Sequence, residues 1–236
     1  MFENRNVHIG YTPNVLTEAT AELTVALLLC TARRLIEATK EVLNGGWGPW
    51  NPLWMCGQGV HGSTVGILGM GRIGLSIAEK LKPFNPKSII YHDVVGESQA
   101  ATAMGLVHIA SRNEFWSLSD FIIVAVSLTP ETNKMIDADA LSRMKPNAIV
   151  INSSRGPVID HEALYDALST NRIRAAGLDV SDPEPMDPNH KLLKLNNFVM
   201  LPHIGSATEK ARNAMADLTV DNILAGLDGQ PLPAPL

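Results

Sequence analysis

Residues 64–81 read TVGILGMGRIGLSIAEKL, and this stretch decides the fold. Residues 64–68 are mostly β-branched or apolar, which predicts a buried strand. Residues 69–74 have the form Gly-x-Gly-x-x-Gly, and residues 75–81 continue with apolar positions at helical spacing. A glycine-rich turn between a strand and a helix is typical of a dinucleotide-binding loop.

Each position of this turn has a physical role. Gly69 permits a tight turn, Gly71 lets the backbone approach a pyrophosphate, and Gly74 allows the helix to pack closely on the strand. Arg72 and Ile73 lie at the helix N-terminus, where free N–H groups attract an anion. We therefore predict that these five residues bind the cofactor.

Asp93 follows 19 residues after Gly74, at the end of the next predicted strand. A carboxylate there can accept hydrogen bonds from both ribose hydroxyls of NAD and repels the 2′-phosphate of NADP. No arginine follows within residues 94–97 to bind such a phosphate. The sequence predicts NAD as the cofactor and leaves NADP possible, while a solvated loop aspartate is the alternative reading.

Short apolar runs and helical segments alternate along the rest of the chain. The predicted strands are 64–68, 88–91, 105–109, 121–126, 148–152, 175–180 and 198–201. The predicted helices are 16–43, 73–81, 112–118, 138–144, 161–169 and 207–224. This alternation predicts an α/β fold with a doubly wound parallel sheet, a Rossmann-type NAD(P)-binding domain.

Composition excludes several classes of protein. The 236 residues have a net charge of −5, and no basic run is longer than Arg33-Arg34, so we expect no nucleic-acid partner. No apolar run approaches the ~20 residues that span a bilayer, so we expect no membrane partner. The two cysteines form no ligand cluster, which predicts no metal site and favours a cytoplasmic protein.

Three polar residues follow the ends of predicted strands. Arg155 follows the strand 148–152, Glu184 follows 175–180, and His203 follows 198–201. Each alone is ordinary, but open α/β sheets bind ligands at the carboxyl ends of their strands. We therefore expect the three side chains to share one site.

The motifs together resemble one family. Residues 69–74, the Asn-x-x-Arg-Gly of 152–156, the Asp-Val-x-x-x-Glu-Pro of 179–185 and the Pro-His-Ile-Gly-Ser-Ala-Thr of 202–208 resemble the D-isomer-specific 2-hydroxyacid dehydrogenases. Within that family, residues 53–57 and 201–208 are most similar to the glyoxylate/hydroxypyruvate reductases. The resemblance covers nearly the whole chain.

The resemblance implies hydride transfer between NAD(P)H and a small 2-oxo acid, glyoxylate or hydroxypyruvate. His203 is then the general acid and Glu184 its partner, because a neighbouring carboxylate favours the protonated ring. Arg155 holds the substrate carboxylate, and Ser206 lies beside the substrate with Arg155 and His203. The resemblance also assigns further residues to cofactor binding: Ser127, Leu128, Thr129, Pro130, Ser153, Asp179 and Gly205.

Four segments follow from these assignments. Residues 1–15 are predicted to be the remnant of a flavodoxin-like substrate domain whose last strand is 7–10. Residues 16–60 hold a helix and a Trp-rich loop that form a homodimer contact, 61–205 bind the dinucleotide, and 206–236 return toward the substrate domain. Since family members carry a larger N-terminal substrate domain, we expect this chain to bind dinucleotide and self-associate but to turn over glyoxylate or hydroxypyruvate poorly or not at all.

Two other functions are compatible with these motifs. One is a dinucleotide-sensing module similar to transcriptional corepressors, which a peptide pull-down would detect. The other is a non-catalytic fragment that merely dimerises, which a turnover assay would separate from an enzyme.

Overall fold

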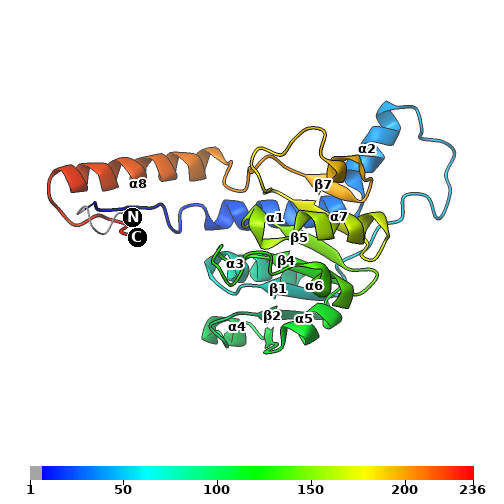
Figure 1. Cartoon of the computed structure of the whole chain (residues 1–236), viewed down its shortest axis with the longest axis horizontal. Coiled ribbons are helices and arrows are strands. Elements are labelled where there is room, and N and C mark those ends of the chain that lie inside the picture. Colours follow the sequence, from blue (N-terminus) through cyan, green and yellow to red (C-terminus); the bar gives the residue numbers. More distant parts are fainter. Residues whose placement is uncertain (1–6) are drawn as a thin grey trace.

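The centre of the molecule is one seven-stranded parallel sheet, seen in a computed structural model that describes residues 7–236 (Figure 1). The strands are β1 (Thr64–Leu68), β2 (Ser88–His92), β3 (Val107–His108), β4 (Phe121–Val124), β5 (Ile149–Asn152), β6 (Ala175–Leu178) and β7 (Phe198–Met200). Their order across the sheet is β3-β2-β1-β4-β5-β6-β7. The order reverses between β1 and β4, which opens a crevice at the carboxyl ends of these two strands. This confirms the predicted doubly wound fold.

Helices cover both faces of the sheet. They are α1 (Thr17–Ala32), α2 (Leu35–Leu43), α3 (Arg72–Leu81), α4 (Gln99–Ala103), α5 (Arg112–Leu118), α6 (Ala138–Arg143), α7 (His161–Ser169) and α8 (Glu209–Leu227). Three short 3-10 helices are η2 (Lys82–Phe84), η3 (Gly156–Val158) and η4 (Lys191–Lys194). Helix α4 and the 3-10 helices were not predicted, because segments of three to five residues carry too little periodicity to be recognised.

Alternate residues of the central strands supply two hydrophobic cores. On one face, Ile123 and Ile151 pack with α1 and α3 through Leu27 and Ile77. On the other face, Ile122 and Val150 pack with α5, α6 and α7. Both sets are fully buried, which explains why β4 and β5 read as continuous apolar runs.

The single helix predicted over 16–43 is wrong, because the chain breaks between α1 and α2. Arg34 adopts a left-handed conformation with φ of 56°, and its side chain binds Glu37. The Gln58 N–H binds the Ala32 carbonyl at 2.9 Å, where the Trp-rich loop returns to the domain. This tertiary contact replaces the hydrogen bond that would have continued α1, and hydrophobic periodicity does not reveal it.

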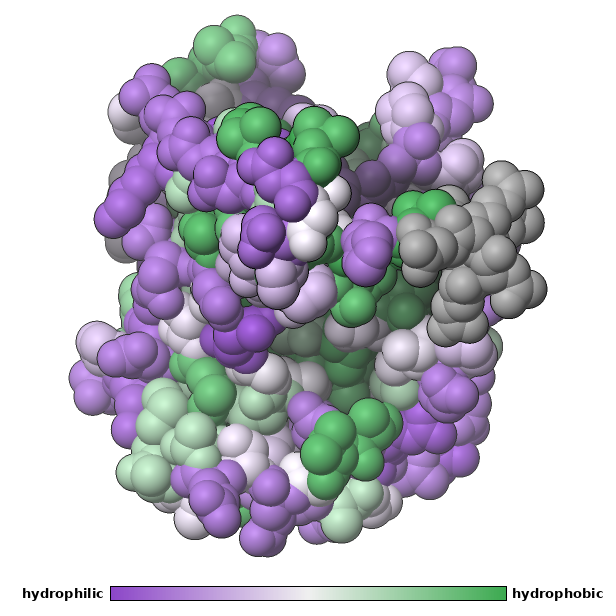
Figure 2. All heavy atoms as spheres, turned by 90° about the vertical axis from the view of Figure 1, so that its left-hand side faces the viewer, coloured by the Kyte–Doolittle hydropathy of each residue, from purple (hydrophilic) through white to green (hydrophobic). Residues whose placement is uncertain are grey.

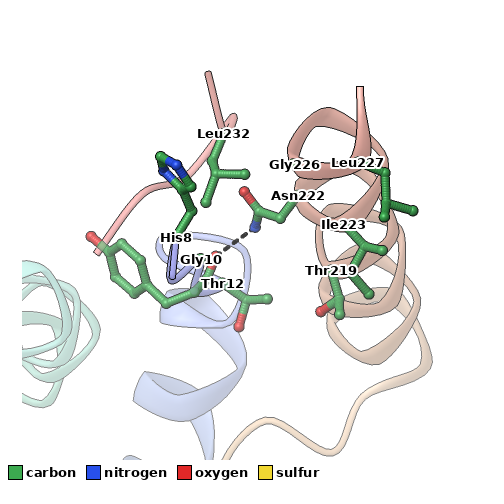
Figure 3. Close-up of a pocket in the computed structure, with 10 residues that line it drawn as sticks. His8, Gly10, Thr12, Thr219, Asn222, Ile223, Gly226, Leu227 and Leu232 are labelled. Atoms are coloured by element: carbon green, nitrogen blue, oxygen red, sulfur yellow. Dashed lines mark hydrogen bonds between the residues drawn. The ribbon is translucent and has the colours of Figure 1, made fainter. Parts of the chain in front are cut away.

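Helix α8 projects from the sheet beside both ends of the described chain (Figure 1). Asn222 of α8 holds both ends, because its Nδ2 donates to the Tyr11 carbonyl at 3.2 Å and its Oδ1 accepts from the Ala234 N–H at 3.0 Å. Figure 3 shows Asn222 beside a cavity of about 480 Å³ between α8 and the N-terminal segment. The strand predicted over 7–10 is wrong: Gly10 forms only an isolated bridge with Pro235. Residues 1–6 of the predicted segment 1–15 lie outside the described residues.

Several predicted ends differ by a few residues. The strands predicted over 121–126 and 175–180 end two residues earlier, because Ala125 and Asp179 begin the loops that line the crevice edge. The last helix, predicted over 207–224, spans Glu209–Leu227 and so continues through Gly226. Throughout residues 7–236, no helix combines the length and apolarity needed to cross a membrane.

Candidate active site

The glycine-rich turn begins where β1 ends. Gly69 has a φ of +94°, and its N–H donates to the His92 carbonyl at 2.9 Å. A Cβ on Gly69 would lie 2.8 Å from the Ala125 carbonyl, so no larger residue fits. A Cβ on Gly74 would collide with the Gly69 carbonyl, which shows how closely α3 approaches the turn. Gly71, in contrast, has open space where its Cβ would be.

Asp93 links the turn to the loop after β2. One oxygen, Oδ2, accepts a hydrogen bond from the Met70 N–H at 2.7 Å, and Oδ1 accepts one from the Val95 N–H at 2.9 Å. A carboxylate has about four acceptor positions, so two remain for a ligand. Asp93 therefore fixes the turn and still offers acceptors at the crevice.

These residues fit a dinucleotide. The space beside Gly71 and the free N–H groups at the start of α3 suit a pyrophosphate, and Asp93 lies where a ribose would follow. The nicotinamide half would then extend past the ends of β4, β5 and β6. No group of three or more His, Cys, Asp or Glu side chains among residues 7–236 is arranged to hold a metal ion.

His203 and Glu184 form a pair at the carboxyl end of β7. The His203 Nδ1 lies 2.8 Å from the Glu184 Oε2, and the Glu184 Oε1 accepts from the Ser181 N–H at 3.0 Å. Burial alone would raise the pKa of Glu184, but hydrogen bonds from His203 and Ser181 and the nearby charge of Arg155 hold that pKa below its usual value. The carboxylate is therefore ionised in the neutral range and acts as an acceptor for His203.

Asp179 fixes the backbone around His203. Its carbonyl accepts from the His203 N–H at 2.8 Å, while its carboxylate accepts from the Ile204 N–H at 2.8 Å and the Gly205 N–H at 2.7 Å. These three bonds hold His203 in a left-handed conformation with φ of 54°. Asp179 is fully buried, and this burial raises its pKa despite the two N–H groups.

Arg155 lies in a loop that its neighbours make rigid. The Asn152 side chain donates to the Arg155 carbonyl and accepts from the Ser154 N–H, both at 2.9 Å. A Cβ on Gly156 would collide with the Ser181 backbone, so the Arg155 loop packs directly on the Glu184 loop. The Arg155 side chain is exposed, and its guanidinium can receive a carboxylate.

A cleft of about 790 Å³ brings most of these residues together. Figure 2 views this side of the molecule, which is hollowed and shows hydrophobic residues within the hollow. Nine of the predicted site residues line the cleft: Ile73, Ser127, Leu128, Ser153, Arg155, Asp179, His203, Gly205 and Ser206.

Eight predicted residues lie outside the lining of this cleft: Gly69, Gly71, Arg72, Gly74, Asp93, Thr129, Pro130 and Glu184. Thr129 is engaged by Thr132, whose hydroxyl accepts from the Thr129 N–H at 2.7 Å, and Pro130 is exposed next to it. Glu184 lines a second cavity of about 560 Å³, and His203 stands between the two cavities. Glu184 therefore contacts the cleft only through His203.

Sequence reasoning missed a second group of residues in the cleft. Thr12 and Leu16 reach it from the segment before α1, Thr20 reaches it from the first turn of α1, and Arg212 and Met215 reach it from α8. Periodicity marks α1 as a packing helix and does not show that its first turn borders a site. One feature of the sequence could have indicated Arg212: it lies one turn into the predicted helix that follows residues 202–208.

Comparisons with known proteins agree with this geometry. A family model for the D-isomer specific 2-hydroxyacid dehydrogenase NAD binding domain matches residues 25–205. The glyoxylate reductase/hydroxypyruvate reductase of Homo sapiens is 50% identical over 234 residues, which are 99% of this chain and 71% of the human protein. The glyoxylate reductase of Thermofilum pendens is 42% identical over 231 residues, which are 98% of this chain and 68% of the relative.

A solved structure has the same fold. The NADPH-dependent glyoxylate/hydroxypyruvate reductase from Sinorhizobium meliloti, crystallised with NADP and malonate, matches with a TM-score of 0.88 and 37% identity. The match covers 100% of this chain and 72% of that chain.

Proposed function

Because the chain belongs to the D-isomer specific 2-hydroxyacid dehydrogenase family, we propose that it interconverts a small 2-oxo acid, glyoxylate or hydroxypyruvate, and the corresponding 2-hydroxy acid. NAD(H) is the redox partner, and NADP(H) is the possible alternative. The observation that carries this proposal is the 2.8 Å pair of His203 and Glu184 at a cleft that Arg155 also lines.

Arg155, Glu184 and His203 have different roles in the proposed reaction. Bound NADH supplies a hydride to the carbonyl carbon of the 2-oxo acid. Arg155 binds the substrate carboxylate through two parallel N–H donors and polarises the carbonyl. Glu184 occupies the His203 Nδ1, so the protonated ring donates from Nε2 to the carbonyl oxygen. In the reverse direction the neutral Nε2 accepts the proton of the hydroxy acid.

The second part of the proposal concerns association and location. Exposed apolar side chains gather on α2 and the Trp-rich loop, among them Leu43, Trp50 and Leu53. Such a patch suits a homodimer interface. Two free cysteines suit a reducing compartment such as the cytoplasm.

An assay of NADH oxidation tests the catalytic proposal. The purified chain is given glyoxylate, hydroxypyruvate or pyruvate with NADH, and we expect measurable oxidation, however slow, with the first two acids. Binding of NADH without oxidation by any 2-oxo acid would contradict the proposal and favour the dinucleotide-sensing alternative.

A further inference from the structure

Helix α1 carries three buried threonines, and they differ in their partners. Thr24 is fully buried, and its Oγ1 lies 2.7 Å from the Thr20 carbonyl and 2.6 Å from the Ser153 Oγ. Thr31, two turns further along, is 4% exposed, and its hydroxyl lacks a partner among the described residues. Thr20 lines the cleft itself, whereas Thr24 connects to it through Ser153, which also lines it.

Hydrogen counting fixes the direction of this chain of hydroxyls. The Thr20 carbonyl can only accept, so the single hydroxyl hydrogen of Thr24 is donated to it. The bond between Thr24 and Ser153 then requires Ser153 to be the donor. Since Ser153 has one hydroxyl hydrogen, it has none left for the cleft. Its free lone pair can only accept from a ligand.

The ligand group that meets Ser153 must therefore be a donor. Ser153 follows β5 and shares the cleft with Asp179 and His203, where the reacting ring has to lie for hydride transfer. The nicotinamide ring carries a carboxamide whose NH2 group is a hydrogen-bond donor. Glyoxylate offers no hydrogen-bond donor; the hydroxyl of hydroxypyruvate is a donor, and measuring cofactor binding without substrate excludes its contribution.

We propose that Thr24 is a positioning residue for the cofactor: it binds the hydroxyl hydrogen of Ser153, so that Ser153 accepts a hydrogen bond from the carboxamide NH2 of the nicotinamide. The inference rests on the proposed function, because it assumes that a nicotinamide dinucleotide occupies the cleft. Thr24 never touches the cofactor and acts through Ser153.

Three single variants, the double variant of Thr24→Val with Ser153→Ala, and one cofactor analogue test this inference. Thr24→Val keeps the shape of the side chain and removes its acceptor, so Ser153 can turn its hydrogen toward the NH2 group. Ser153→Ala removes the acceptor itself. Thr31→Val is the matched control on the same helix. The analogue is reduced 3-acetylpyridine adenine dinucleotide, in which a methyl group replaces the NH2.

Dissociation constants are measured by fluorescence titration without substrate. We expect Thr24→Val and Ser153→Ala each to weaken NADH binding about three- to tenfold, as loss of one hydrogen bond predicts. The double variant should be no weaker than Ser153→Ala, and Thr31→Val should match wild type. The four variants and wild type should all bind the acetylpyridine analogue with the same dissociation constant.

Other results would overturn the inference. Equal weakening of NADH and the analogue, additive losses in the double variant, or unchanged NADH binding in Thr24→Val would each do so. If Thr24→Val does not fold, Thr24→Ser restores the hydroxyl, and Ser153→Ala with the two cofactors still decides the outcome. Failure of wild type to bind NADH would instead contradict the proposed function.

Discussion

At the scale of single residues, the site depends on backbone contacts that hold a few polar side chains. His203 keeps its left-handed conformation because three acceptors of Asp179 bind successive N–H groups. Glu184 is held by Ser181 and in turn orients His203. One imidazole nitrogen is thereby occupied, and the other is left for the substrate.

Removing the imidazole tests its role as the general acid. General acid–base catalysis contributes about 10² to 10⁴ in rate, so His203→Ala should lose at least ~100-fold in turnover of hydroxypyruvate. NADH affinity should change little, because His203 donates to the substrate. The exposed His61 supplies a control, and His61→Ala should keep wild-type turnover. Near-normal turnover in His203→Ala would remove the residue from this role.

The lowered pKa of Glu184 predicts how the pair responds to acid. A carboxyl whose pKa is lower in the folded state stabilises the fold above its ordinary pKa of about 4.3, and this contribution is lost as the pH falls through the lowered value. Wild type should therefore melt at a higher temperature than Glu184→Gln at neutral pH, and the difference should shrink in acid. A difference in melting temperature that stays the same below the pKa of Glu184 would contradict the pairing of Glu184 with His203.

At the scale of elements, the loops after β1 and β2 act as one unit because Asp93 binds the N–H groups of both Met70 and Val95. The sequence shows the spacing of Asp93 from the glycines but does not show that the carboxylate also braces the turn. Loss of Asp93 therefore affects both the ribose contact and the phosphate loop.

The negative charge of Asp93 predicts the choice between the two dinucleotides. Wild type should bind NADH more tightly than NADPH, because a 2′-phosphate would face the carboxylate. Asp93→Asn removes the repulsion. The ratio of the dissociation constants for NADPH and NADH should then fall at least about tenfold, as the loss of a single like-charge contact predicts. The nearby exposed Glu97 is the control, and Glu97→Gln should keep the preference. Tighter binding of NADPH by wild type would contradict the assignment.

Local patterns predicted the sheet and its glycine loop well, because buried parallel strands and a strand-to-helix turn leave clear signals in the sequence. The break between α1 and α2 could not be predicted, since it depends on the Gln58 N–H reaching back to the Ala32 carbonyl. The same holds for Thr20 and Arg212. They reach the cleft from helices far from the glycine loop in sequence, and only the fold brings them together.

At the scale of the whole molecule, the cleft and the Trp-rich loop are separate features. The cleft lies between the crevice edge of the sheet and the start of α8. The loop lies at the other end of α1, where the chain leaves and rejoins the domain (Figure 1). Catalysis and association can therefore be altered independently.

Changes in the loop test the proposed dimer. Trp50 is 87% exposed and Leu53 is 82% exposed, so Trp50→Ser with Leu53→Ser should remove apolar interface area with little effect on folding. Sedimentation should show a dimer for wild type and a monomer for the double variant. Val95, 91% exposed in the loop after β2, is the control, and Val95→Ser should remain a dimer. A monomeric wild type would contradict the proposed interface.

The central claim is that this chain transfers a hydride between a nicotinamide dinucleotide and a 2-oxo acid. The most direct measurement incubates the purified chain with hydroxypyruvate and NADH that carries deuterium at both hydrogen positions of C4 of the nicotinamide ring, and analyses the product by mass spectrometry and NMR. This measurement detects transfer even when turnover is slow. We predict glycerate with deuterium at C2, and at least ~100-fold less of it from His203→Ala. Glycerate without deuterium at C2, or its absence while NADH is bound, would contradict the account.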